Sequence, residues 1–207
     1  MFSGYRGYVI GWINFIISLK YSRTGEILAG AQSGFTLNEL IVALAITGTI
    51  SASAGPSLYS FVVGSNQTTQ LNALFTDLSY ARSESIKRGV PTIVCKSNNG
   101  ESCNRAAEWH DGWLVFADDN NNLVLDDSEE PLRVHQQSPD GIRIKYGAFR
   151  SRGRYVQYLP MGHTSTNGTF TICIGADGES AKAIITSRTG RSRVSSKTSN
   201  NKVLNCS

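Results

Sequence analysis

The chain has 207 residues, a formal net charge of +4 and 40% hydrophobic residues, a composition that allows one globular domain with a core. Its four cysteines lack paired C-x-x-C spacing, which argues against a zinc site, and no cofactor is indicated. Its three histidines (His110, His135 and His163) have no nucleophile at motif spacing, so we expect a protein that is not an enzyme.

The first element in chain order is an apolar run over 35–55 that follows a Gly34-Phe35 junction. Its 21 residues are long enough to cross a bilayer as a helix, so we expect a transmembrane segment. One carboxylate, Glu39, lies inside the run. Placing a charged side chain in the middle of a membrane costs about 2.5–3.5 kcal/mol of insertion free energy, so its presence indicates that Glu39 has a function. If the chain is cut after Gly34, the new amine of Phe35 can pair with Glu39 of a neighbouring copy.

The segment Gly34-Phe35-Thr36-Leu37-Asn38-Glu39-Leu40 resembles the processing site of type IV prepilins, and Pro56 stands where these pilins carry a helix-bending proline. Asn38 departs from the family's usual aliphatic residue. The resemblance implies cleavage by prepilin peptidase after Gly34 and N-methylation of Phe35. It also implies a single-pass precursor in the inner membrane that then joins other pilins in an extracellular or periplasmic filament.

Residues 1–34 are the expected prepilin leader and are kept apart from the fold. Such leaders are usually short, and the apolar patch from Val9 to Leu19 is too short to span a bilayer. Either the start is assigned too far upstream or the leader is extended, and we favour the first explanation.

After the apolar run, residues 56–89 are predicted to continue the helix in amphipathic form. Leu71, Leu74 and Leu78 follow helical spacing, so we expect this stripe to be core. Gly89 and Pro91 should end the helix.

Residues 90–207 are predicted to form a β-rich domain outside the cytoplasm, with Asn-Gly and Asp-Gly pairs between strands. The fold class is therefore α+β and pilin-like, with a long N-terminal helix packed on antiparallel sheets. The predicted strands are Thr92–Lys96, Gly112–Ala117, Leu132–Gln136, Gly141–Tyr146, Arg154–Tyr158, Thr169–Ile174, Ala181–Ser187 and Arg193–Ser196.

Two stretches narrow the resemblance to the GspH/FimT branch of pilin-like proteins. Residues 81–89 read A-R-S-E-S-I-K-R-G, and residues 109–116 read W-H-D-G-W-L-V-F, similar to the W-x-D-G-W-x-V-F segment of that branch. We expect these residues to serve the fold, with Trp109 and Trp113 in or beside the core and Gly112 at a bend.

An even number of cysteines in an exported domain predicts disulfides. Three pairings are possible, and we favour Cys95–Cys103, which closes a short polar loop, and Cys173–Cys206, which ties down the C-terminal tail. Each bond is worth about 2–4 kcal/mol.

The stretch 118–129 has oxygen donors at positions 1, 3, 5, 9 and 12 of a calcium loop. Leu123, however, occupies the position where such loops need glycine for a sharp turn. An acidic turn between strands is the favoured interpretation, and calcium binding is left as the alternative.

Charge is strongly segregated along the domain. Residues 95–140 have three basic and ten acidic side chains, whereas residues 141–207 have eleven basic and two acidic ones. Such blocks favour an electropositive face and a polyanionic partner, although a solvated surface remains possible.

The segment 187–193 reads S-R-T-G-R-S-R and resembles the G-R-x-R element of FimT-type minor pilins. Guanidinium groups bind phosphate in bidentate fashion. Gly190 permits a backbone conformation at the turn that residues with a Cβ rarely adopt. The resemblance implies a site for double-stranded DNA made by Arg188, Gly190, Arg191, Arg193 and Lys197. A second basic cluster is Arg150, Arg152 and Arg154, which can also be a solubilising edge strand.

The function expected from these features is that of a minor type IV pilin that captures extracellular DNA for natural transformation. Its contacts would be to the phosphate backbone and independent of base sequence. The alternative is a structural minor pilin, or a type II secretion pseudopilin, that initiates or caps the filament. A tip adhesin is a third possibility.

Overall fold

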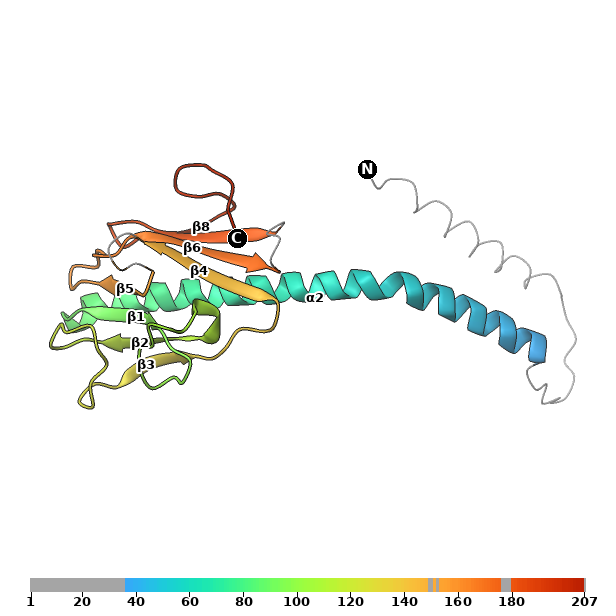
Figure 1. Cartoon of the computed structure of the whole chain (residues 1–207), viewed down its shortest axis with the longest axis horizontal. Coiled ribbons are helices and arrows are strands. Elements are labelled where there is room, and N and C mark those ends of the chain that lie inside the picture. Colours follow the sequence, from blue (N-terminus) through green and yellow to red (C-terminus); the bar gives the residue numbers. More distant parts are fainter. Residues whose placement is uncertain (1–35, 149–150, 152, 176–179, 207) are drawn as a thin grey trace, which may run out of the picture. The chain divides into compact units, whose positions relative to one another are not determined.

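The computed structural model describes residues 36–148, 151, 153–175 and 180–206, without the side chains of 52–57 and Tyr59 (Figure 1). The predicted leader, the Gly34-Phe35 junction, Arg150 and Arg152 lie outside this range. The described chain divides into two compact units, 1–49 and 50–207, and each is treated by itself.

Helix α2 (Leu37–Arg88) begins directly after the threonine of the predicted processing segment. Thr36 caps it, since its hydroxyl and carbonyl accept hydrogen bonds from the amides of Glu39 and Leu40 (3.3 and 3.1 Å). Glu39 is exposed in the first turn, where a negative charge favours the helix dipole. In the apolar run the Thr49 hydroxyl bonds to the carbonyl of Ala45 (3.1 Å), so the helix backbone satisfies this polar group.

Among the residues that the structure describes, no helix is both long enough and apolar enough to cross a membrane. The transmembrane segment expected over 35–55 therefore stays a prediction.

The helix ends where glycine and proline were expected to stop it. Gly89 takes a left-handed conformation (φ 71°), and its amide bonds to the carbonyl of Ser85 (3.1 Å). In the last turn, Arg88 bonds to Glu84 (2.7 Å), and this hydrogen bond lowers the pKa of the Glu84 carboxyl.

Two four-stranded antiparallel sheets follow, one in the order β3-β2-β1-β5 and one in the order β4-β6-β7-β8. Each strand lies within two residues of its predicted bounds, which confirms the α+β fold. A 3₁₀ helix, η1 (Trp109–Asp111), was not predicted. The strands are β1 (Thr92–Lys96), β2 (Trp113–Ala117), β3 (Pro131–His135), β4 (Ile142–Ala148), β5 (Tyr155–Tyr158), β6 (Gly168–Ile174), β7 (Ala181–Thr186) and β8 (Ser192–Ser195).

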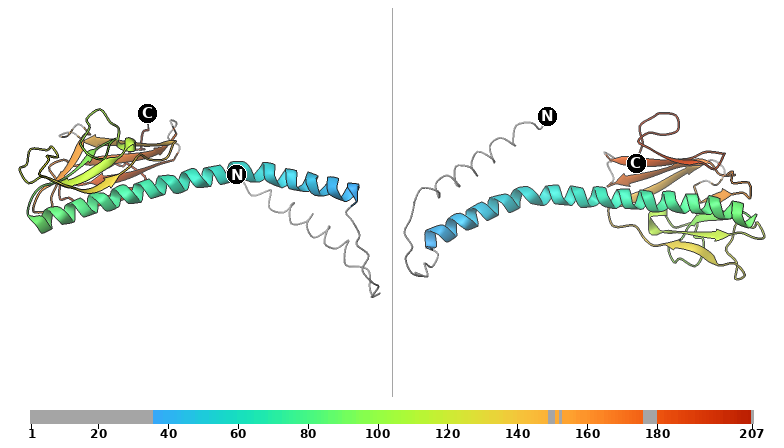
Figure 2. Two further views of the ribbon diagram at one scale, coloured as in Figure 1. Left: turned by 90° about the horizontal axis from the view of Figure 1, so that it is seen from below. Right: turned by 180° about the vertical axis from the view of Figure 1, so that it is seen from behind.

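The predicted stripe of α2 is the centre of the core, and both sheets pack along this part of the helix (Figures 1 and 2). Leu74 and Leu78 are fully buried against inward-facing side chains such as Val115 of one sheet and Ile172 of the other. The helix thus joins two sheets that share no strand pairing.

The two tryptophans serve the fold, as expected. Trp109 packs edge-on against Phe170 (centroids 4.8 Å apart), and its indole nitrogen donates to the carbonyl of Gly153 (2.7 Å). Trp113 is fully buried, and its indole nitrogen donates to Asp77 of α2 (2.9 Å). Gly112 between them has φ 129°, and a Cβ there would lie 2.6 Å from a backbone oxygen of β3, so the bend requires glycine.

Both favoured disulfides are present, Cys95–Cys103 and Cys173–Cys206, with Cα–Cα distances of 5.7 and 6.0 Å. The second bond joins the C-terminal segment to β6, and Lys145 of the neighbouring β4 donates to the carbonyl of Cys206 (2.9 Å). This segment therefore belongs to the folded domain, with Leu204 buried.

Candidate nucleic-acid interface

The predicted arginine element forms the turn between β7 and β8, residues 187–191. The amide of Ser187 donates to the carbonyl of Arg191 (3.0 Å), and the amide of Gly190 donates to the carbonyl of Ser187 (2.9 Å). These hydrogen bonds close the hairpin, so Arg191 stands at the entry to β8 and Arg188 at the tip.

Gly190 is required by two features of the turn. Its φ is +77°, which residues with a Cβ rarely adopt, and a Cβ there would overlap the carbonyl oxygen of Gly162. The turn therefore lies directly on the loop around Gly162, and Gly190 itself is buried.

Arg82 of α2 holds both segments. Its Nε donates to the carbonyl of Gly162 (2.9 Å), and its terminal nitrogen donates to the carbonyl of Thr189 (3.3 Å). Arg82 and Thr189 are 107 residues apart, so this contact brings the A-R-S-E stretch of the helix to the segment 187–193. Sequence reasoning assigned residues 81–89 to the fold but missed this contact, because nothing in the local pattern shows which backbone Arg82 reaches.

The side chains of Arg188, Arg191, Arg193 and Lys197 are exposed. In the described part of the chain every ion pair involves Glu84 or Asp77, so these four cations keep their charge free. The neighbouring Tyr158 is buried below β8, its hydroxyl 3.4 Å from Ser192, and burial raises its pKa. That phenol therefore stays neutral and does not offset the cationic surface.

The register shows which way the arginines face. Ile184 lies in the core against α2 and pairs with Val194, so the adjacent pair, Ile185 and Arg193, belongs to the outer face of the sheet. The side chain of Arg193 therefore leaves the sheet on the side away from the helix, and Arg191 lies in the turn directly before β8.

Two further cations on this outer face were not predicted. Arg143 and Lys145 alternate with buried residues along β4, and Lys145 aligns through β6 and β7 with Ser195. Their spacing of two residues was the signal in the sequence, since alternate residues of a strand share a face. They extend the basic character of the outer face across the sheet.

A polar groove of about 540 Å³ begins beside the arginine at the tip of the turn. Arg188, His163 and Asn167 are among its lining residues, and the C-terminal segment contributes Ser199. It offers hydrogen-bonding groups next to exposed positive charge.

The second predicted basic cluster is only partly described. Arg154 precedes β5, where its Nε donates to the carbonyl of Ser151 (3.2 Å). It lines a cavity beside the Cys95–Cys103 disulfide and not the groove at Arg188. The structure therefore places Arg154 at a separate site.

The acidic loop 118–129 uses its carboxylates for its own folding. Asp118 accepts the amides of Asn122 and Leu123 (both 3.0 Å), and Asp126 accepts the side-chain amide of Asn122 (2.8 Å). Across residues 36–206 as described, no group of three or more Asp, Glu, His or Cys side chains could hold a metal ion. The favoured acidic turn agrees with this arrangement.

A long helix packed on two antiparallel sheets is the pilin-like arrangement expected from the sequence. The family model described as "Type II transport protein GspH" matches residues 70–190, and the chain belongs to this family. It is thus a non-enzymatic minor pilin or pseudopilin of a type IV pilus or a type II secretion system. Family membership implies an inner-membrane precursor, a place in a filament, and other pilins as partners.

Solved structures show similar folds. Two crystal structures of the type IV minor pilin FimU from Pseudomonas aeruginosa are each 20% identical and have TM-scores of 0.47 and 0.46. They cover 67% and 65% of this chain and 93% and 96% of their own. The minor pseudopilin EpsH from the Vibrio cholerae type II secretion system is 10% identical with a TM-score of 0.45, over 63% of this chain and 96% of its own. No curated protein matches the chain.

Proposed function

We propose that the chain is a structural minor subunit that initiates or caps a pilin-type filament through α2. The observation that carries this proposal is a row of exposed apolar side chains at the start of the helix, including Leu37, Leu40, Ile41 and Leu44. A continuous apolar surface of this kind marks contact with lipid or with other helices. Family membership supports the same role.

Glu39 provides the test. In the proposed assembly it pairs with the amine of a neighbouring copy's Phe35 after cleavage by prepilin peptidase. Glu39→Ala should leave the amount of protein in the inner membrane unchanged and remove the chain from sheared filaments. Glu101→Ala, an exposed carboxylate of the domain, is the matched control. Entry of the Glu39→Ala chain into filaments at the normal level would refute the proposal.

A second candidate function is the capture of double-stranded DNA for natural transformation. It is supported by the free, exposed cations of the β7–β8 hairpin, of which Arg193 lies on the outer face of the sheet. Neutralisation of phosphates by such groups releases counterions, so binding should be independent of base sequence and steeply dependent on salt.

DNA binding by the full chain in detergent, measured over a range of salt concentrations, tests this candidate. Loss of two phosphate contacts in Arg191→Ala with Arg193→Ala should reduce the log–log salt slope by about 1.8. Lys87→Ala is the control for the single variant Arg191→Ala. It also removes one positive charge, but from α2, and should leave DNA binding and the salt slope nearly unchanged. An unchanged slope in the double variant would exclude these arginines as the site.

Deletion of the gene distinguishes the two cellular settings. Loss of transformation with retained pili favours DNA capture, whereas loss of exoprotein secretion favours a secretion pseudopilin. Loss of the filaments themselves favours an initiating role.

A further inference from the structure

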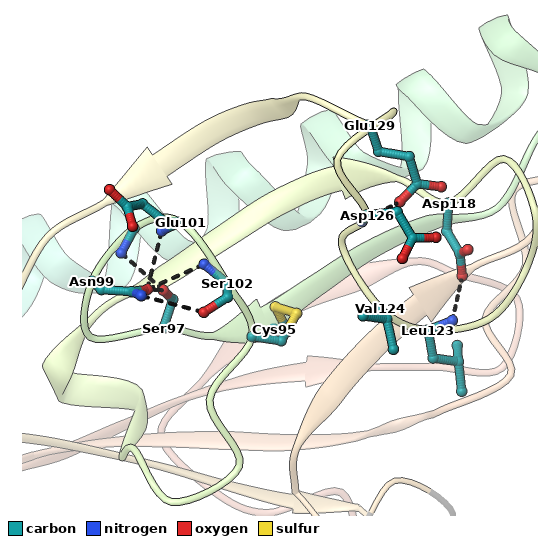
Figure 3. The surroundings of a disulfide bond; sticks show 12 residues. Cys95, Ser97, Asn99, Glu101, Ser102, Asp118, Leu123, Val124, Asp126 and Glu129 are labelled. Carbon is teal, nitrogen blue, oxygen red and sulfur yellow. Dashed lines mark hydrogen bonds between the residues drawn. A yellow bond between two sulfur atoms is a disulfide. The ribbon is translucent and has the colours of Figure 1, made fainter.

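A cavity of about 200 Å³ lies beside the Cys95–Cys103 disulfide, on the sheet that does not contain β7 and β8. Figure 3 shows this disulfide between the polar loop that it closes and the acidic loop, where Leu123 and Val124 lie. Three cations line the cavity, namely Lys96, Arg105 and Arg154. No acidic residue is among the described residues that line it.

Lys96 is the most informative of these cations. It is only 9% exposed, at the end of β1, and among the described residues its ammonium donates to one acceptor, the carbonyl of Arg105 (3.1 Å). An ammonium has three donors, and a lysine this deeply buried is normally paired with a carboxylate. Lys96 forms no ion pair within the part of the chain that the structure describes. The position therefore suits an anion that comes from outside the chain.

The nearby carboxylates are already engaged. Asp118 and Asp126 accept hydrogen bonds from amides of the acidic loop, and Glu129 accepts the amide of Asp119 (2.8 Å). Figure 3 shows these groups clustered within the acidic loop. The cavity is therefore a local positive site within the most acidic part of the sequence.

Size and lining limit the kind of anion. Pockets for drug-sized ligands hold about 300–1,000 Å³, so this cavity suits a smaller molecule. Arginine guanidinium groups bind phosphate oxygens in bidentate fashion, and Lys96 adds a compact charge. Leu123, Val124 and Tyr155 supply an apolar and aromatic surface for an organic group attached to the anion.

We propose that this cavity binds a small phosphate ester, with the phosphate on Lys96, Arg105 and Arg154 and a sugar-sized group against Tyr155. The site is independent of the β7–β8 hairpin, because Arg188 belongs to a separate groove. The phosphate can come from a free nucleotide or from the end of a nucleic-acid strand.

Titration of the full chain in detergent with thymidine 5′-monophosphate, followed by calorimetry, tests the site. Thymidine without phosphate should bind at least tenfold more weakly. Arg105→Gln, an exposed residue whose loss should not affect folding, should weaken nucleotide binding at least tenfold. The matched control, Arg143→Gln on β4, should bind like the wild type. Equal binding of thymidine, or no effect of Arg105→Gln, would overturn the proposal.

Two further measurements complete the test. Phosphate in place of chloride at equal ionic strength should raise the melting temperature more for the wild type than for Arg105→Gln, because its general stabilising effect acts on both, and equal rises would overturn the site. Tighter binding of a 5′-phosphorylated than of an unphosphorylated oligonucleotide identifies a strand end as the source, and binding confined to the mononucleotide identifies a free nucleotide. Either result supports the site. Arg191→Ala with Arg193→Ala should leave nucleotide binding unchanged, so failure of the DNA-binding candidate is distinguishable.

Discussion

Two segments of the domain carry several charged side chains: the acidic loop between β2 and β3, and the turn between β7 and β8. They differ in what these side chains contact. Asp118 and Asp126 point their oxygens at amides of their own loop. Arg188 and Arg191 expose their guanidinium groups to solvent, because backbone hydrogen bonds already close their turn. Charge that satisfies the local backbone stabilises the fold, whereas charge left free on a rigid turn is available to a partner. The following predictions test this contrast, from the largest effect on stability to the smallest.

Gly190→Ala should have the largest effect, because a methyl group must displace the Gly162 carbonyl and φ is positive. We expect a loss of about 2–4 kcal/mol in unfolding free energy, measured by chemical denaturation. Gly141→Ala is the control: its φ is +84° but no atom lies within 4 Å of the added Cβ, so it carries strain alone. Equal costs at the two positions would mean that the contact with Gly162 contributes nothing.

Asp118→Asn should cost about 1–3 kcal/mol, since the buried carboxylate loses one of two acceptors for backbone amides. Asp127→Asn, in the same loop but exposed, should be nearly neutral in the same denaturation assay. If the two variants are equally stable, the acidic loop does not depend on its buried carboxylate.

Arg82→Lys should cost about 1 kcal/mol and lower the melting temperature by about 2–4 °C, because an ammonium cannot bridge the two carbonyls as a guanidinium does. Arg143→Lys, an exposed arginine on β4, serves as the control and should leave the melting temperature unchanged. A DNA-binding assay on the same variant reports whether the turn must be held for its arginines to act.

Arg191→Ala with Arg193→Ala should change the unfolding free energy by less than about 0.5 kcal/mol, because both side chains are exposed and unpaired in the described structure. The comparison variant, Asp118→Asn with Asp126→Asn, should be clearly less stable. Similar stability losses in both double variants would abolish the distinction between the two segments.

Some spatial relations could not be read from the sequence. The alternating arginines at 150–154 predicted a second basic cluster, and its described member, Arg154, lies beside the Cys95–Cys103 disulfide. Arg82 reaches the β7–β8 turn, Lys96 is buried with no ion pair to a described residue, and neither relation leaves a local pattern. Contacts between residues about 10 to 100 positions apart depend on how the sheets are packed.

By itself the sequence determined the order and bounds of the strands, the end of α2 at Gly89 and the buried stripe through Leu74. These features follow from local propensity and from the period of the apolar residues, which neighbouring residues encode directly. The tertiary structure confirmed the favoured one of three disulfide pairings, and it alone brought Arg82 to Thr189. It also decided which charged side chains remain available to a partner. A charged group is engaged only if the fold places a hydrogen-bonding group beside it to replace the water that surrounds it in the unfolded chain.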